Sequence, residues 1–136
     1  MTNSIKNLVS LFILSVFFLL AVGSGGDKKP ATPDVKISST QLYDAYKANE
    51  VAADNSYKGK VIAVTGTVDG VGKDIMDDTY ITLVGDGVIG TVQCFISKDF
   101  ISKAATVSKG TTITITGTCD GKLMNVLLKD LSLIHI

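Results

Sequence analysis

The chain has 136 residues and a formal net charge of +0, with 13 lysines, no arginine and 13 acidic residues. This length is enough for one domain once a targeting segment is set aside. The absence of arginine argues against a partner that needs a planar bidentate cation, because only the guanidinium group offers that fork to phosphate or guanine. From residue 37 onward nine lysines face eleven acidic residues, whereas domains that bind nucleic acid usually carry a basic excess.

The N-terminus has the pattern of an export signal. One lysine precedes an apolar run over residues 8–22, and small residues follow it. The stretch LAVGS resembles the lipobox of bacterial lipoproteins, but Ser24 stands where the acylated cysteine would be, so we expect no acylation there. We predict a signal peptide over residues 1–23, either cleaved or retained as a membrane anchor. The protein is then exported to the periplasm or cell envelope, and only this segment touches the membrane.

A polar stretch over residues 24–37 contains both prolines and no apolar period, and it is predicted to be a flexible tether. The folded domain is expected over residues 38–136. Its first element is a predicted helix over residues 39–52, because hydroxyl residues at its start can cap it and apolar residues recur at helical spacing. Leu42, Tyr43 and Tyr46 form the expected buried face.

The remaining elements alternate with period two, apart from one short helix. Residues 85–87, Gly-Asp-Gly, predict a hairpin between the second and third strands. An apolar stripe over residues 98–110, with Gly110 at its end, predicts the helix. The five predicted strands cover residues 60–71, 79–87, 89–97, 111–121 and 123–136.

Two strands carry nearly the same sequence, VTGTVDG from Val64 and ITGTCDG from Ile115. Neither copy contains a nucleophile beside a base, so a repeated catalytic loop is not expected. Five strands with a helix between the third and fourth follow the order of the OB-fold, a partly open Greek-key barrel whose first and fourth strands are neighbours. We therefore expect Gly66 and Gly117 to be bend points in those strands, and residues 69–70 and 120–121 to end them in turns.

Several stretches resemble the tRNA_anti-like family of bacterial OB-fold proteins. They are QLYDAYKANEVAADNSYKGKVIAVTGTV, VQCFI, KGTTITITGTC and the closing VLLKDLSLI, which together span residues 41–134. The resemblance implies a mainly β, five-stranded OB-fold barrel with an N-terminal helix and a short helix between strands 3 and 4. It also implies nucleic-acid binding, although this function rests on analogy between folds.

Two cysteines share the parity of the apolar residues on their strands, so both Cys94 and Cys119 are expected to point inward. In an oxidising compartment an inward-facing pair favours a disulfide between them. The alternative is two buried free thiols.

The outer face of the second and third strands is the expected binding surface, because OB-folds commonly bind ligands there and stack them on aromatic side chains. Tyr80 and Phe95 would then stack a base or a sugar ring. Alternatively, the helix over residues 39–52 packs on these two aromatics and makes them part of the core. The candidate ligand-binding residues are Tyr80, Thr82, Gln93 and Phe95, with Lys73, Lys98 and Lys122 as charge contacts.

Catalytic and metal-binding patterns are missing from the sequence. His135, the single histidine, is the penultimate residue, and three aspartates over residues 74–78 lack the spacing of an EF-hand loop. We therefore expect a binding module that is not an enzyme and has no cofactor or metal. Its expected partners are single-stranded nucleic acid, bound weakly, or an oligosaccharide or an envelope protein.

Overall fold

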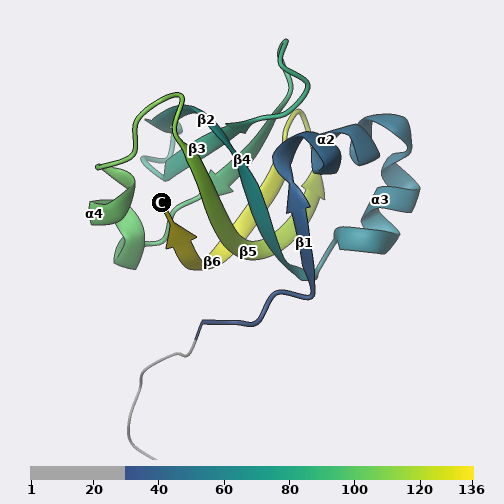
Figure 1. Cartoon of the computed structure of the whole chain (residues 1–136), viewed down its shortest axis with the longest axis horizontal. Helices are drawn as coiled ribbons and strands as arrows, with labels where there is room; N and C mark the ends of the chain where they lie inside the picture. Colours follow the sequence, from purple (N-terminus) through teal and green to yellow (C-terminus); the bar gives the residue numbers. More distant parts are fainter. Residues whose placement is uncertain (1–29) are drawn as a thin grey trace, which may run out of the picture.

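The computed structural model describes residues 30–136, so the predicted signal peptide lies outside the described part of the chain. The described part is mainly β, and five of its strands close into a barrel (Figure 1). The strand order is β2-β3-β4-β6-β5, and β5 pairs back onto β2. The barrel strands are β2 (Val61–Lys73), β3 (Thr79–Val84), β4 (Thr91–Phe95), β5 (Thr112–Lys122) and β6 (Val126–His135).

This topology confirms the predicted OB-fold. The β4–β6 pair is parallel, and the other barrel pairs are antiparallel. The pairing of β2 with β5 makes the two strands that carry the similar sequences neighbours, as that fold requires, and the two motifs meet at the Val64–Ile115 pair. Alternation along the strands places Ile81, Leu83, Val92 and Cys94 in the core, where none of them is exposed to solvent.

One strand was not predicted. β1 (Val35–Ser38) begins in the stretch predicted to be the tether, and it pairs in parallel with the first half of β2. Val35 lies opposite Ile62, and Ser38 lies opposite Thr65. The alternating Val-x-Ile pattern of this segment is short and follows two prolines, so the local sequence resembles a linker. The tether therefore ends before residue 35.

The predicted single helix is two helices, α2 (Ser39–Ala48) and α3 (Glu50–Tyr57), which meet at Asn49. Ser38 forms a capping box with Gln41 at the start of α2. Asn49 has an extended backbone, and its side chain accepts a hydrogen bond from the Ala52 N–H at 3.0 Å. The asparagine therefore ends one helix and caps the next, which a helical period alone does not reveal.

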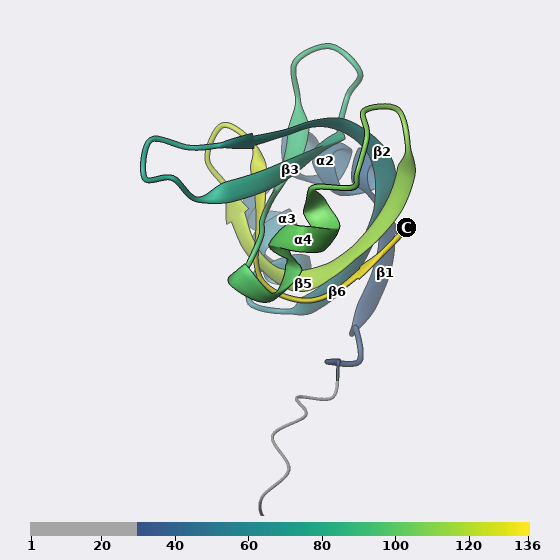
Figure 2. The ribbon, with the colours of Figure 1, turned by 90° about the vertical axis from the view of Figure 1, so that its left-hand side faces the viewer.

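The helices close the two ends of the barrel. Figure 2 shows α4 (Ile101–Ala104) before one opening, with α2 and α3 behind the other. A 3-10 turn, η1 (Lys98–Phe100), leads into α4, so this helical segment is shorter than the predicted one over residues 98–110. Only Ala104 of α4 is fully buried. Both ends are thus covered while the outer faces of the strands stay uncovered by α2.

The repeated glycines make close contacts. A Cβ atom on Gly66 would overlap the side chain of Ser39 at the start of α2. A Cβ atom on Gly117 would lie 2.7 Å from Leu131 Cδ2 and 2.8 Å from the Lys129 carbonyl oxygen on β6. The register of β5 and β6 shifts at this point, so Gly117 faces an irregularity in the neighbouring strand.

The prediction that the two Asp-Gly pairs end their strands is wrong. β2 continues through residues 69–70 to Lys73, and β5 continues through residues 120–121 to Lys122. The register shifts beside both pairs, between Val68 and Gly70 and between Cys119 and Lys122. Each Asp-Gly pair therefore marks an irregularity within a long strand.

Candidate binding face

The candidate face is the outward side of β2, β3 and β4, which we call the outer face. Tyr80 lies directly opposite Phe95, and Thr82 lies directly opposite Gln93. All four side chains are half-buried, and their inward neighbours form the core. The strand alternation predicted this outward orientation correctly.

The N-terminal helices do not cover these aromatics. The buried face of α2, Leu42, Tyr43 and Tyr46, belongs to the core cluster inside the barrel, which does not include Tyr80 or Phe95. The Ser39 hydroxyl donates to the Val84 carbonyl at 2.6 Å, at the end of β3. The alternative in which α2 packs on the outer aromatics is therefore wrong, because its apolar residues close the end of the barrel.

Two glycines of β2 lie beneath the side chains of β3. Gly72 is paired with Tyr80 and Gly70 with Thr82. The hydroxyl end of the Tyr80 ring lies over Gly72, and the Thr82 hydroxyl donates to the Gly70 carbonyl at 3.3 Å. At these two positions of β2, the outer face therefore consists of backbone without side chains.

A residue that the sequence did not suggest completes this face. Asn125, in the turn between β5 and β6, donates from Nδ2 to Gln93 Oε1 at 3.0 Å. Only the pairing of β4 with β6 brings this turn beside β4, so no local pattern could have indicated the contact. The amide pair leaves Gln93 Nε2 and Asn125 Oδ1 for other partners.

The three candidate lysines do not gather around the aromatics. Lys73 pairs with Asp77 at 2.8 Å. Lys122 forms an ion pair at 2.9 Å with Glu50, so it links the end of β5 to the start of α3. That hydrogen bond also raises the pKa of Lys122. Lys98 begins η1, is exposed, and has no ion-pair partner among residues 30–136.

A hollow of about 460 Å³ lies beside Phe95, between the β2–β3 loop and β6. The loop is held by Asp74, whose Oδ1 accepts from the N–H groups of Met76 at 2.8 Å and Asp78 at 2.9 Å. Lys129 on the other wall is hydrogen-bonded to Asp120 at 2.6 Å, which raises its pKa. The lining residues are Asp74, Met76, Asp78, Phe95, Ile96, Ser97, Lys129 and Asp130. Acidic groups therefore predominate next to Phe95.

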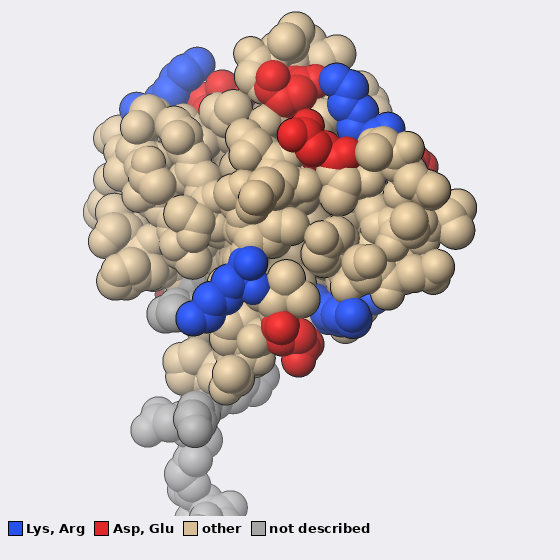
Figure 3. All heavy atoms as spheres, turned by 45° about the vertical axis from the view of Figure 1, so that its right-hand side comes forward, with Lys and Arg blue, Asp and Glu red and all other residues tan. Residues whose placement is uncertain are grey.

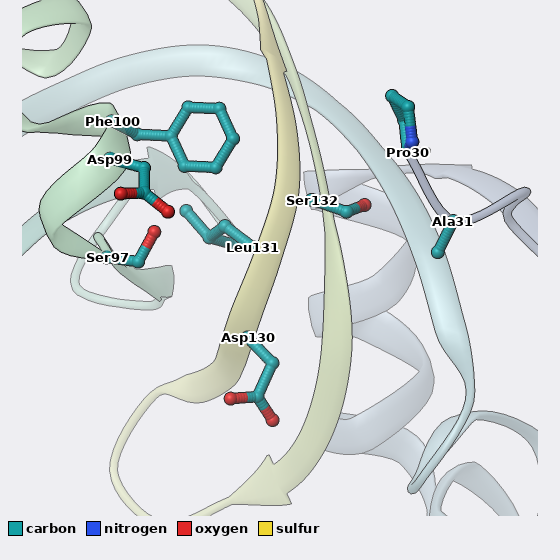
Figure 4. Close-up of a pocket in the computed structure, with 8 residues that line it drawn as sticks. All are labelled: Pro30, Ala31, Ser97, Asp99, Phe100, Asp130, Leu131 and Ser132. Carbon is teal, nitrogen blue, oxygen red and sulfur yellow. The ribbon is translucent and has the colours of Figure 1, made fainter. Parts of the chain in front are cut away.

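A second hollow of about 560 Å³ continues from Ser97 and Asp130 past η1 (Figure 4). Its polar groups do not converge: Ser97 and Asp99 lie on one side of β6, and Ser132 points to the other side, where Pro30 and Ala31 lie. Figure 3 shows that charges of both signs are also interspersed on the face that presents the helical end, with uncharged surface between them. The face in Figure 3 therefore carries no patch of a single sign.

The sequence matches the model of the tRNA_anti-like family over residues 4–132. The chain belongs to this family. None of the curated proteins compared with the chain matches its sequence.

Three solved structures resemble this tRNA_anti-like chain. A "putative nucleic acid-binding lipoprotein" from Klebsiella pneumoniae is 18% identical, with a TM-score of 0.60, over 83% of this chain and 100% of that one. An OBody bound to hen egg-white lysozyme is 16% identical, with a TM-score of 0.50, over 60% of this chain and 84% of that one. A "putative aspartyl-tRNA synthetase" from Leishmania major is 13% identical, with a TM-score of 0.51, over 84% of this chain and 22% of that one. At these identities the likeness shows the shared fold.

The cysteines of the tRNA_anti-like chain are free, so the predicted disulfide is not formed in the structure. Both thiols are buried as expected, but Cys94 and Cys119 both lie opposite Leu128, one on each side of β6. Strands are about 4.8 Å apart, so two residues on either side of a third strand are separated by about 9 Å, beyond the roughly 7 Å Cα limit for a disulfide. The parity prediction was correct, and the pairing was wrong.

The two thiols lie on different strands of the core, Cys94 on β4 and Cys119 on β5. Burial raises the pKa of the Cys94 thiol. Cys119 Sγ lies 3.5 Å from the Tyr46 hydroxyl. The pKa of Tyr46 is raised, mainly by burial and secondly by this hydrogen bond. The contact between Tyr46 and Cys119 connects α2 to β5 inside the barrel, away from the outer face.

Within residues 30–136 no group of three histidine, cysteine or acidic side chains is placed to hold a metal ion. None of the helices in that range is long and apolar enough to span a membrane.

Proposed function

We propose that the protein is a binding module, not an enzyme, and that its outer face binds single-stranded nucleic acid by stacking. The observation that carries the proposal is the Tyr80–Phe95 pair, which lies on the outer face and is not covered by α2. Stacking on aromatic side chains is how OB-folds hold single strands without reading their sequence. Family membership and the likeness to the "putative nucleic acid-binding lipoprotein" from Klebsiella pneumoniae support the same ligand class.

The charges support a weak interaction. Two of the three candidate lysines are engaged in ion pairs, and the hollow beside Phe95 is mainly acidic. Affinity that depends on phosphate contacts falls steeply with salt, and few contacts give a shallow dependence. We expect micromolar or weaker binding that tolerates changes of base order.

An oligosaccharide is the second candidate. The outward residues of the outer face, together with Asn125, carry no formal charge: Gly70, Gly72, Tyr80, Thr82, Gln93 and Phe95. Aromatic rings with amide and hydroxyl groups suit a neutral sugar as well as a base. This reading predicts binding that does not change with salt.

We further propose that the module acts outside the cytoplasm, in the periplasm or envelope. The support is the signal-like pattern of residues 1–23. Cytoplasmic tRNA is then not a reachable partner. Fractionation of cells that express the full chain tests this, and recovery in the cytoplasmic fraction alone would contradict it.

The ligand test is a titration of the exported protein with labelled single-stranded DNA and RNA and with neutral oligosaccharides, at low and physiological salt. We expect weak binding of the single strands, lowered about tenfold by Tyr80→Ala or Phe95→Ala, because stacking contributes on the order of 1–3 kcal/mol per base. Thr112→Ala is the matched control, because this exposed residue lies on β5, outside the outer face. If both aromatic variants bind single strands as tightly as the wild type does, the proposal is refuted. Binding of sugars alone, with no dependence on salt, would favour the second candidate.

A further inference from the structure

The position of Tyr80 depends on the absence of a side chain at Gly72. An ideal Cβ on Gly72 would lie 3.0 Å from the Tyr80 hydroxyl oxygen and 3.1 Å from Cζ. The two residues are direct partners across β2 and β3. The phenol therefore reaches across to the neighbouring strand, and its far end lies on the backbone.

This orientation is unusual for a strand residue, because side chains normally stand roughly perpendicular to the sheet. A ring that lies along the sheet turns one side towards the backbone and leaves the other side for a ligand. The adjacent pair on the same face differs: a Cβ on Gly70 would have Thr82 Oγ1 as its nearest neighbour at 3.5 Å, an ordinary contact. Only Gly72 of these two glycines is thus in tight contact with the side chain opposite it.

We propose that Gly72 is a positioning residue that holds Tyr80 along the sheet and so presents its ring as a stacking surface. The inference rests on the proposed function, since it concerns the same face and the same ligand. The mechanism is preorganisation: a ring already held in place loses less conformational freedom when a base stacks on it. A methyl group at position 72 shifts the hydroxyl end of the ring by a few tenths of an ångström, because the flexible side chain yields before the backbone does.

The experiment is a double-mutant cycle on the full chain, with a labelled single-stranded oligonucleotide as probe. We expect Gly72→Ala to weaken binding about three- to tenfold, and Thr112→Ala, at an exposed residue of β5 outside the outer face, to change it by less than about twofold. In the Tyr80→Ala background, Gly72→Ala should have no further effect, because no ring remains to be displaced. An equal loss of affinity from Gly72→Ala with and without Tyr80 would overturn the inference, as would wild-type affinity in the single variant.

A second readout needs no ligand. Nuclear Overhauser contacts between the Gly72 α-protons and the Tyr80 ring are expected in the wild type and should weaken in Gly72→Ala, while the melting temperature stays within a few degrees. If these contacts are absent from the wild type, the inference is wrong whatever the binding shows. If they are present and the wild type binds no oligonucleotide, the nucleic-acid function is wrong and Gly72 positions no ring for it.

Discussion

Replacing Gly117 with alanine tests whether the repeated Gly-Thr motif serves close packing. The added Cβ would lie 2.7 Å from Leu131 Cδ2 and 2.8 Å from the Lys129 carbonyl oxygen. Leu131 is 7% exposed, and the carbonyl belongs to the β6 backbone, so neither neighbour can move freely. Overpacking of this kind costs about 1–3 kcal/mol, and the backbone contact places Gly117→Ala near the upper end of that range.

The assay is thermal unfolding followed by circular dichroism. For a domain of about 100 residues, 1 kcal/mol shifts the melting temperature by roughly 4–8 °C, so we expect Gly117→Ala to lower it by about 10 °C or more. Gly70→Ala is the control, because its Cβ would meet nothing closer than 3.5 Å. Equal melting temperatures for Gly117→Ala and the wild type would refute the packing argument, and a loss of ligand binding at unchanged stability would make Gly117 a ligand contact instead.

Three further outcomes are expected. The denatured, unreduced protein should titrate two thiols, and the native protein should react slowly because Cys94 and Cys119 are buried; a count of zero would restore the disulfide. The pKa of Asp86 is lowered to about 2, mainly because its carboxylate accepts hydrogen bonds from the N–H groups of residues 88 and 90. The ionised carboxylate should therefore stabilise the fold above pH 4, and this stabilisation should disappear as the pH falls towards 2. Comparing wild type with Asp86→Ala over this range checks the sign, because a difference that grows on acidification would contradict it. Asn49→Ala should lower stability by about 1 kcal/mol through loss of the α3 cap, measured by urea unfolding, and an unchanged midpoint would argue against that role.

Local patterns predicted the barrel because period-two alternation determines which side chains face the core. Ile81 and Val92 were placed correctly for this reason, and the outward orientation of Tyr80 and Phe95 follows from the same parity. The chain order of the elements then suggested the topology. The family resemblance agreed with both.

Features that depend on contacts between distant segments could not be predicted in this way. Parity placed Cys94 and Cys119 in the core, and the predicted strand order puts β6 between their strands, but neither gives the register in which both cysteines lie opposite Leu128. The apolar face of α2 was visible in the sequence, whereas the surface that it packs against was not. Asn125 reaches the outer face only through the pairing of β4 with β6, and the role of Gly72 depends on register across β2 and β3.

β1 has a mechanical consequence for the whole barrel. Because β1 runs parallel to β2 and the N-terminal segment enters at its first residue, a pull on that segment acts along the strand axis. The pairs from Val35 to Ser38 would then be loaded together in shear instead of being unzipped one at a time. Force would pass to β2 over residues 62–65, whereas β3 pairs with β2 beyond them, from residue 68 onward. A chain held by its N-terminus could thus bear tension while the strands around Tyr80 keep their register.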